Sequence, residues 1–434
     1  MRLLAPLLLT LVALGISGLL WWQLYRRHRY TQGKRPNLFP MLLAVGVLCR
    51  LAYTFLTPAF YAPDEQSHFN HIKFIATHGE FAVQTTKLGD SANEWEHNQP
   101  PLYYLALAPL YHFADLMGWG QTATVLFLRS FSFLLWLLNI WCGITLLNRL
   151  QITDKLIRTF FLGLLCLLPT YTFSSVAINN DNLLITLGGA LLCLLSRRDY
   201  SAKNFLLCGL LLGLSLLTKQ SAVVFIPVIA TLGLVEILQK RISVPAGLTF
   251  LTLALGSAFL IYLPWAIRNW QVYHTLTPEF GVVDQIKWPS FAYGCASAAH
   301  NLLKSFWAVS GIANDINYPF PLLGMLFLAA CFGAGQMGLH RKRTFDAPHS
   351  NQNQPLLLAM GIGLLANTCL VLRFGYLFGM GQGRHLFPLL FPIALILGNY
   401  LRPFAVKKLE VHTAGCWILY ALTFAAFSLA RFPR

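Results

Sequence analysis

Residues 204–238 read NFLLCGLLLGLSLLTKQSAVVFIPVIATLGLVEIL, and this stretch decides the fold class. Two apolar runs, 204–218 and 221–238, are separated by a short polar step that contains Lys219. Each run approaches the ~20 apolar residues that a helix needs to cross a bilayer. The apolar residues are continuous rather than alternating, which favours spanning helices over the strands of an outer-membrane barrel. The stretch therefore predicts two consecutive membrane-spanning helices.

The same pattern recurs along the whole chain. Of the 434 residues, 56% are hydrophobic and 11% are charged, whereas a soluble globular chain carries about 25% charged residues. We therefore expect an all-α, polytopic transmembrane helical bundle of about 12 spans. The expected spans are 3–24, 38–60, 122–147, 157–176, 182–196, 204–218, 221–238, 246–264, 318–338, 355–372, 386–401 and 411–430.

The charges separate onto two sides of this bundle. The net charge is +16, but more than half of the Lys and Arg residues fall in loops that alternate with the spans, at 26–35, 149–158, 197–203, 239–241, 340–343 and 402–408. Most of the acids fall on the opposite side. Basic loops of membrane proteins face the cytoplasm, so the basic balance does not indicate nucleic-acid binding. We expect a multi-pass protein of the cytoplasmic (inner) membrane.

Three regions are expected. Residues 1–37 form an additional, uncleaved N-terminal helix and a basic cytoplasmic loop, because the positive charges follow the apolar stretch rather than precede it. Residues 38–401 form the core, with two long outer loops at 61–121 and 264–318. Residues 402–434 form a cytoplasmic loop and the last spanning helix. Within the outer loops, Pro100–Met117 and Ala298–Val309 are expected to be helices on the membrane surface.

The nine cysteines do not indicate a disulfide framework. No CxxC pair occurs, and only Cys295 lies clearly outside the expected spans. The others are expected to be small buried apolar residues.

Adjacent carboxylates open the first outer loop. Asp64 and Glu65 follow Pro63 directly after a span, and His68 lies one turn further on. A carboxylate at this place can accept a proton from a hydroxyl nucleophile or bind a divalent cation. The alternative is a helix cap, because acids are common in a first helical turn.

The first outer loop ends in polar and aromatic residues. Glu94, Glu96, His97 and Gln99 precede Pro100 and Pro101, and Tyr103 follows. These side chains are expected to form a substrate wall or a metal position. The alternative is an interfacial anchor, because aromatic residues concentrate at that depth.

Cations on the outer side oppose the positive-inside bias and need a reason. Lys219, Arg268, Arg373 and Arg384 are expected there. An anionic lipid phosphate is a natural partner, with glycines before Arg384 letting backbone N–H groups approach the same anion. The alternative is snorkelling into the headgroups.

Other polar residues have two interpretations each. Arg50 and Arg129 fall inside expected spans, where they either pair with acids in the bundle or mark misplaced span ends. Asn179, Asn180 and Asp181 form a polar step between two helices, and a structural turn is its simplest interpretation.

In this order, the motifs resemble the GT-C class of membrane glycosyltransferases, over about residues 40 to 400. The matching stretches are Pro63-Asp64-Glu65 with His68, residues 97–104 (HNQPPLYY), residues 178–181 (INND), residues 209–219 (GLLLGLSLLTK), residues 268–270 (RNW), residues 305–307 (SFW) and residues 382–388 (QGRHLFP). Relatives include protein O-mannosyltransferases and lipid A aminoarabinose transferases. The first expected span is an addition to the class pattern. We expect no counterpart of the large soluble C-terminal domain of some relatives, so any acceptor recognition placed there is expected elsewhere.

The resemblance implies a polyprenyl-phosphate sugar donor and an active site at the outer face. It places the catalytic base at Asp64, with Glu65 as neighbour or substitute, and Lys219 near the donor phosphate. Arg268 and Arg384 are expected to neutralise the same phosphate. One base without a covalent intermediate would invert the anomeric configuration. The residues expected to line the substrate are His68, His97, Gln99, Tyr103, Asp181 and His385.

The expected function is therefore transfer of a sugar to a hydroxyl acceptor, which is a glycan, a lipid or a protein. The expected partners are this donor, the acceptor and membrane lipids, with no nucleic acid. No cofactor is certain, and a divalent metal stays open. Two alternatives also stay open: a lipid or polysaccharide transporter or flippase, and a non-catalytic assembly partner. Transporters usually show internal repeats and ionisable residues near the bilayer midplane, and neither is evident here.

Overall fold

The computed structural model describes residues 38–85, 95–278, 286–311, 315–316, 319–324, 326, 353–401 and 409–433. The expected N-terminal region 1–37, the basic loops at 340–343 and 402–408, and most of the expected span 318–338 lie outside these residues.

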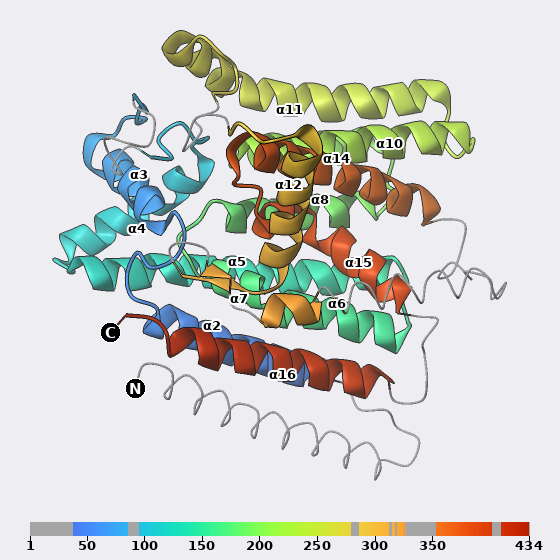
Figure 1. Cartoon of the computed structure of the whole chain (residues 1–434). Helices are drawn as coiled ribbons and strands as arrows, with labels where there is room; N and C mark the ends of the chain where they lie inside the picture. The colour runs from blue at the N-terminus through green and yellow to red at the C-terminus, as the bar shows by residue number, and fades with distance from the viewer. Residues whose placement is uncertain are drawn as a thin grey trace.

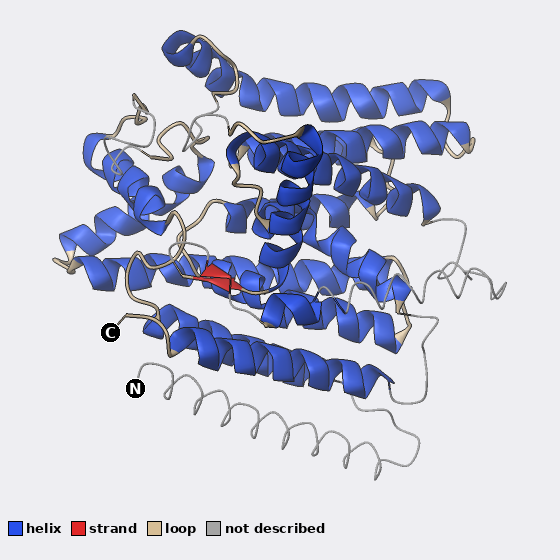
Figure 2. Ribbon diagram, in the orientation of Figure 1, coloured by secondary structure: helices blue, strands red, loops and turns tan. Residues whose placement is uncertain are grey.

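The fold is a helical bundle, as predicted (Figure 2). Within the described residues the strands are β1 (Val309–Ser310) and β2 (Asp315–Ile316), which pair antiparallel. The helices are α2 (Phe39–Leu56), α3 (Glu65–His78), α4 (Leu102–Leu116), α5 (Gln121–Arg149), α6 (Lys155–Leu167), α7 (Pro169–Ser174), α8 (Asp181–Leu195), α9 (Ala202–Leu216), α10 (Phe225–Leu238), α11 (Val244–Tyr273), α12 (Phe291–Trp307), α14 (Gln354–Phe378), α15 (Leu390–Tyr400) and α16 (Leu409–Leu429), with the 3₁₀ turns η1 (Gln220–Val224) and η2 (Gly383–Leu389).

Six of the described helical segments are long and apolar enough to cross a membrane: α2, α5, η1 with α10, α11, α14 and α16. Their outward faces are apolar. Trp141 on α5 and Leu260 on α11 are each 65% exposed, as suits a surface in contact with lipid. The chain is therefore a multi-pass membrane protein, although the expected count of about 12 spans is not confirmed.

The long helices run side by side in Figure 1, with α2 packed on α16 along one edge and α10 and α11 along the other. Helices α3 and α4 gather at one end of the bundle, whereas α12 crosses the long helices and contacts α14 and η2. These two groups belong to the two expected outer loops, and they frame the place where the candidate site lies.

Prolines explain where the helices depart from the expected spans. The expected span 157–176 is broken, because α6 ends at Leu167 and Pro169 begins α7, where its missing N–H costs nothing. The expected end of a span at Pro264 is wrong, since α11 continues through this proline to Tyr273. The expected span 386–401 is split into η2 and α15. Helices α4 and α12 occur where surface helices were expected, and α12 begins earlier, at Phe291.

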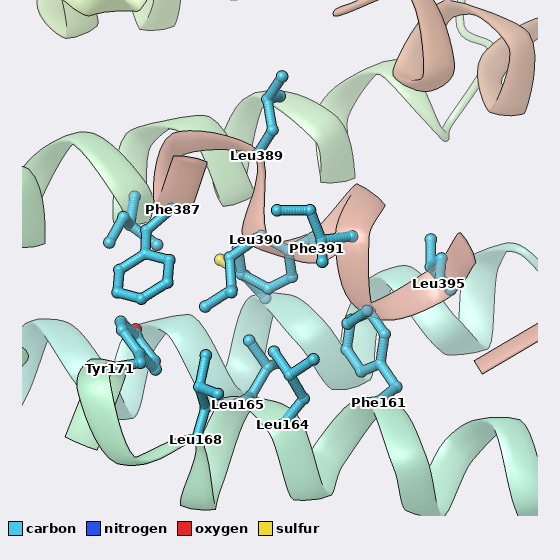
Figure 3. Packing of buried hydrophobic residues seen from close by; sticks show 14 of the residues in the cluster. Phe161, Leu164, Leu165, Leu168, Tyr171, Phe387, Leu389, Leu390, Phe391 and Leu395 are labelled. Atoms are coloured by element: carbon cyan, nitrogen blue, oxygen red, sulfur yellow. The ribbon is translucent and has the colours of Figure 1, made fainter. Parts of the chain in front are cut away.

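Aromatic and aliphatic side chains fix η2 and α15 on α6 and α7 (Figure 3). Phe387 of η2 meets Tyr171 of α7 edge-on at 5.4 Å between ring centroids, and Phe391 lies 6.1 Å from Phe161 of α6. All four rings are buried. This packing holds in place the turn that carries Arg384.

Glycines allow two further close approaches between elements. At Gly209 of α9, a Cβ would lie 2.5 Å from the Ala254 carbonyl oxygen of α11, so these helices pack backbone to backbone. At Gly383, a Cβ would lie 2.2 Å from Phe306 Cα. The Gly383 N–H donates to Ser305 Oγ at 2.7 Å. Gly383 therefore lets η2 pack against α12, and its N–H is already used within the protein.

The two arginines inside expected spans are both buried. Arg129 of α5 pairs with an acid, Glu65, which confirms one of the two interpretations. Arg50 of α2 is held without an acid: it donates to Cys166 O at 2.6 Å and Ser175 Oγ at 2.9 Å, and it lies 3.9 Å above the Trp136 ring. It ties α2 to α5, α6 and the residue after α7.

Candidate functional site

Asp64 lies directly before α3 in the left-handed backbone region, at φ 60°. Its side chain makes no capping hydrogen bond to that helix, so the capping alternative does not account for it. Instead, the carboxylate accepts a hydrogen bond from Arg384 Nη2 at 2.5 Å, and the Asp64 side chain remains 31% exposed. A strained backbone that presents a partly open carboxylate is a feature of functional sites.

Glu65 has a different environment from its neighbour. Its side chain is fully buried and accepts two hydrogen bonds from Arg129, at 2.8 Å from Nε and 2.6 Å from Nη2. The backbone N–H groups of Phe60 and Ile178 also donate to it, at 3.0 and 3.2 Å. Its oxygens are occupied by these contacts, so the geometry favours Asp64 over Glu65 as the reactive acid.

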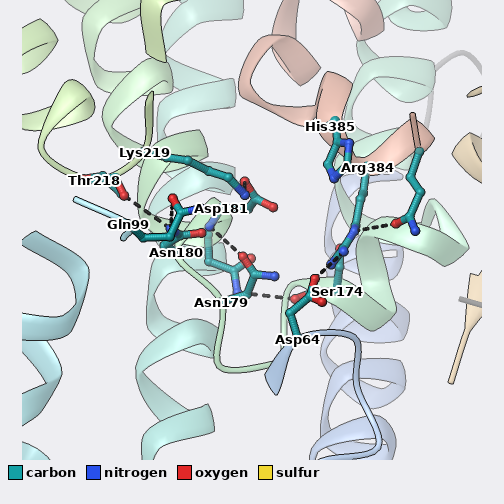
Figure 4. Close-up of polar contacts among 12 residues, drawn as sticks. Asp64, Gln99, Ser174, Asn179, Asn180, Asp181, Thr218, Lys219, Arg384 and His385 are labelled. Atoms are coloured by element: carbon teal, nitrogen blue, oxygen red, sulfur yellow. Dashed lines mark hydrogen bonds and ion pairs between the residues drawn. The ribbon is translucent and has the colours of Figure 1, made fainter. Parts of the chain in front are cut away.

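A second ion pair faces the first (Figure 4). Lys219, just after α9, donates to Asp181 at the start of α8 across 2.7 Å. The preceding turn is structural: Asn179 Oδ1 accepts from the Asp181 N–H at 2.8 Å, and Asn180 Nδ2 donates to the Thr218 carbonyl at 3.3 Å. This confirms the turn interpretation for the two asparagines and shows that they also aim Asp181 at Lys219.

The two pairs form one electrostatic cluster. Burial raises the pKa of Asp64, but Arg384, His68 and Lys219 outweigh it and leave this pKa at about 2. Arg384 is buried, which lowers its pKa, but Asp64 and Asp181 more than compensate and raise it overall. The two acids and the two basic side chains therefore interact as one cluster, in which each acid is paired with a basic partner.

Histidines and tyrosines of the first outer loop form a wall beside Asp64. His68 Nδ1 lies 2.9 Å from Tyr104 Oη, and His71 stacks on Tyr104 at 3.8 Å between ring centroids. The ring of His97 lies 5.0 Å from that of His71. Burial, opposed by Asp64, lowers the pKa of His68 to about 3, so this ring is neutral.

Gln99, Tyr103 and His385 were also expected to line the substrate. Gln99 Oε1 accepts from Asn180 Nδ2 at 3.4 Å, and Tyr103 Oη accepts from the Asn179 N–H at 2.9 Å. Tyr103 is fully buried, so the structure brings it to the turn rather than to an open surface. His385 follows Arg384, and burial together with Arg384 and Lys219 lowers its pKa to about 3.

Arg268 makes its described contacts elsewhere. Its guanidinium donates to the Ala82 carbonyl at 2.5 Å and lies over the rings of Trp265 and Tyr273 at 4.6 and 5.4 Å. These contacts tie α11 to the first outer loop and do not join Arg268 to Asp64 or Arg384. Its role at a donor phosphate stays a prediction.

Glu96 was expected only as one of the acids in the stretch that forms a substrate wall or metal position, and no role of its own was predicted for it. Its Oε2 is buried and makes no hydrogen bond, and its backbone lies at φ 69°. Burial and the charge of Asp64 raise its pKa to about 7, although Lys219 and Arg384 lower it. The sequence does not predict a left-handed backbone at Glu96, because Glu rarely adopts this conformation.

No group of three or more His, Cys, Asp or Glu side chains is arranged to hold a metal ion in the part of the chain that the structure describes. The divalent metal considered from the sequence therefore gains no ligand set from these residues.

Comparison with solved structures identifies a known architecture for the fold. ArnT from Cupriavidus metallidurans in the apo state superposes with a TM-score of 0.54 over 90% of this chain and 76% of its own, at 14% identity. The chain has a GT-C-like fold. ArnT bound to undecaprenyl phosphate gives a TM-score of 0.53 at 14% identity, over 90% of this chain and 77% of its own.

A third GT-C structure agrees. The archaeal oligosaccharyltransferase AglB from Archaeoglobus fulgidus, in complex with an inhibitory peptide and a dolichol-phosphate, gives a TM-score of 0.52 at 14% identity. The match covers 91% of this chain but 56% of AglB. No protein-family model and no curated protein sequence matches the chain. The GT-C resemblance inferred from the motifs is thus confirmed for the fold.

Proposed function

We propose that this protein is a membrane glycosyltransferase. It moves a sugar from a polyprenyl-phosphate donor to a hydroxyl acceptor at the outer face of the cytoplasmic membrane, with inversion. The observation that carries the proposal is the meeting of two ion pairs, Asp64–Arg384 and Asp181–Lys219, at one site in a GT-C-like bundle. These four residues are far apart in the sequence but lie together in the fold as two ion pairs. A structural role alone does not require such buried charges.

The cations fit an anionic lipid phosphate. Lys219 and Arg384 are only 20% and 10% exposed as side chains, so a phosphate that reaches them meets little competition from water. Arg384 offers a planar fork and Lys219 a point charge. Both are held by carboxylates, so a donor phosphate competes with Asp64 and Asp181 for them. Polyprenyl phosphates bound to ArnT and AglB support this choice of ligand.

The reaction then needs few parts. The acceptor oxygen forms a bond to the anomeric carbon while the bond from that carbon to the phosphate oxygen breaks, and its electron pair leaves with the polyprenyl phosphate. Lys219 and Arg384 stabilise the charge that grows on this leaving group. Asp64 accepts the hydrogen bond of the attacking hydroxyl, aims it opposite the leaving group and takes its proton as the new bond forms. A single displacement of this kind inverts the anomeric centre.

The test is consumption of a defined donor. Purified protein in liposomes is offered a panel of radiolabelled polyprenyl-phosphate sugars together with membrane extract as the acceptor source. The proposal predicts that one donor loses its label to a product that requires both protein and extract. Movement of intact donor across the bilayer without loss of the sugar would instead identify a flippase.

A further inference from the structure

The carboxyl group of Glu96 has no structural task that its contacts explain. Its Oε2 is buried and makes no hydrogen bond. Buried polar atoms almost always have partners, and a buried acceptor without one destabilises the folded protein. The backbone at φ 69° adds strain, because a residue with a Cβ rarely adopts this region. The chain thus maintains an unfavourable arrangement at this position.

The main chain around Glu96, by contrast, is firmly held. The Glu96 carbonyl accepts from the Gln99 N–H at 3.1 Å and from the ring of His71. Asn98 Nδ2 donates to the Pro278 carbonyl at 3.1 Å, which links the turn to the second outer loop. None of these contacts uses Oε2 of Glu96, so the position of the turn is determined while this oxygen remains available.

The carboxyl group belongs to the same cluster as the two ion pairs. Burial is the largest effect on its pKa, and Asp64 is the largest charge effect, followed by Lys219, Asp181 and Arg384. Tyr104 of the aromatic wall is also close enough for Glu96 to act on its pKa. The titratable and charged groups that surround Glu96 are therefore Asp64, His71, His97, Tyr104, Asp181, Lys219 and Arg384.

The carboxyl groups of Asp64 and Glu96 lie in one cluster but have different pKa values. The pKa of Asp64 is about 2, because Arg384 and His68 outweigh its burial, whereas the pKa of Glu96 is about 7. Such a separation is how one site divides its acid and base tasks. Asp64 is ionised at neutral pH and orients a hydroxyl well, but it cannot keep a proton. Glu96 can keep a proton near neutral pH.

We propose that Glu96 takes up the proton that the acceptor hydroxyl loses. This inference rests on the proposed transferase function. In it Glu96 does not touch the substrate and acts through Asp64. As the acceptor oxygen bonds to the anomeric carbon, its O–H bond breaks and the proton passes by way of Asp64 to the Glu96 carboxylate. The leaving phosphate keeps the electron pair of its broken bond. Glu96 then releases the proton to water after the product leaves, which restores the starting charges.

Glu96→Gln is the decisive variant, because Gln has the same shape and the same backbone strain but cannot hold the proton. We expect kcat at pH 8 to fall on the order of 100-fold, with little change in KM for the donor. In the wild type, kcat should decline as the pH falls through about 7, because Glu96 becomes protonated and can no longer accept. This decline should be absent in Glu96→Gln, and Glu96→Asp should recover part of the rate. Glu80→Gln, an exposed change in the same loop, is the matched control.

Infrared titration gives a second readout that does not need turnover. A protonated carboxyl band should disappear as the pH rises through about 7 in the wild type and should be missing in Glu96→Gln. An unchanged pH–rate profile in Glu96→Gln, or a band that has already gone at pH 5, would overturn the role of Glu96 while the wild type still transfers sugar. Absence of transfer by the wild type itself would remove the proposed function, and this inference with it.

Discussion

Replacing Glu65 with Gln is expected to damage folding rather than chemistry. The change removes the negative charge that faces Arg129 and turns one of its oxygens into an N–H donor. Glu65 and Arg129 are 0% and 1% exposed as side chains, and two hydrogen bonds of 2.6 and 2.8 Å join them. Arg129 also donates to the carbonyl groups of Thr54 and Thr57, at the end of α2.

The magnitude follows from this burial. Breaking a buried ion pair by removing one partner costs about 3–5 kcal/mol, because the other charge is left without compensation. The matched change Asp64→Asn affects a pair whose acid is 31% exposed, so water compensates part of the lost contact and the cost is smaller than at Glu65. Neighbouring acids should thus give opposite results: Glu65→Gln lowers stability, and Asp64→Asn lowers activity.

The assay is unfolding by denaturant in detergent, with transfer measured per folded molecule. Replacing both members, as Glu65→Leu with Arg129→Met, should restore part of the stability that either single change removes, because no charge is then stranded. Wild-type stability in Glu65→Gln, together with complete loss of transfer, would refute this reasoning and return Glu65 to the catalytic role considered from the sequence.

Two further predictions concern the donor and the topology. Lys219→Ala should raise KM for the donor about 10- to 100-fold, because a charged hydrogen bond worth ~1.5–3 kcal/mol is lost. Arg384→Lys should keep only part of the activity, because Lys lacks the planar fork of Arg. Donor titration of the purified variants measures both effects, and unchanged values would mean that these cations only anchor the protein in the lipid headgroups. In a chain without its native cysteines, Glu80→Cys should react with a membrane-impermeant thiol reagent in intact cells, whereas Arg197→Cys should not. Both positions are exposed, so equal labelling of the two would contradict the positive-inside orientation.

Much of the fold could be predicted because bilayer-spanning helices have a simple requirement. Runs such as 122–147 and 355–372 fall within a few residues of α5 and α14, except that α14 extends further to Phe378. The span prediction was wrong at two prolines: one helix continues through a proline at which it was expected to end, and one expected span is broken at a proline. Pro264 lies inside α11, whereas Pro169 separates α6 from α7. A single sequence does not say whether neighbouring helices satisfy the backbone groups that a proline frees.

The site could be predicted as a set of residues but not as a set of contacts. Asp64 and Arg384 are 320 positions apart, and only the fold shows that they pair. Glu65 is chemically equivalent to Asp64 in sequence, and what separates them is a buried arginine on α5. Glu96 was visible as an acid in the loop, but its importance comes from a positive φ and an unpartnered oxygen, which no residue pattern encodes.

The central claim is that Asp64 serves transfer and not donor binding or folding. The measurement is single-turnover transfer from saturating donor by wild type and Asp64→Asn in liposomes, with donor binding and unfolding followed on the same preparations. We predict that Asp64→Asn binds the donor at least as well as the wild type, because Arg384 is no longer shared with a carboxylate, and unfolds at a similar denaturant concentration. Its transfer rate should fall by about 100- to 10,000-fold. Transfer at the wild-type rate by a folded, donor-bound Asp64→Asn protein would contradict the account.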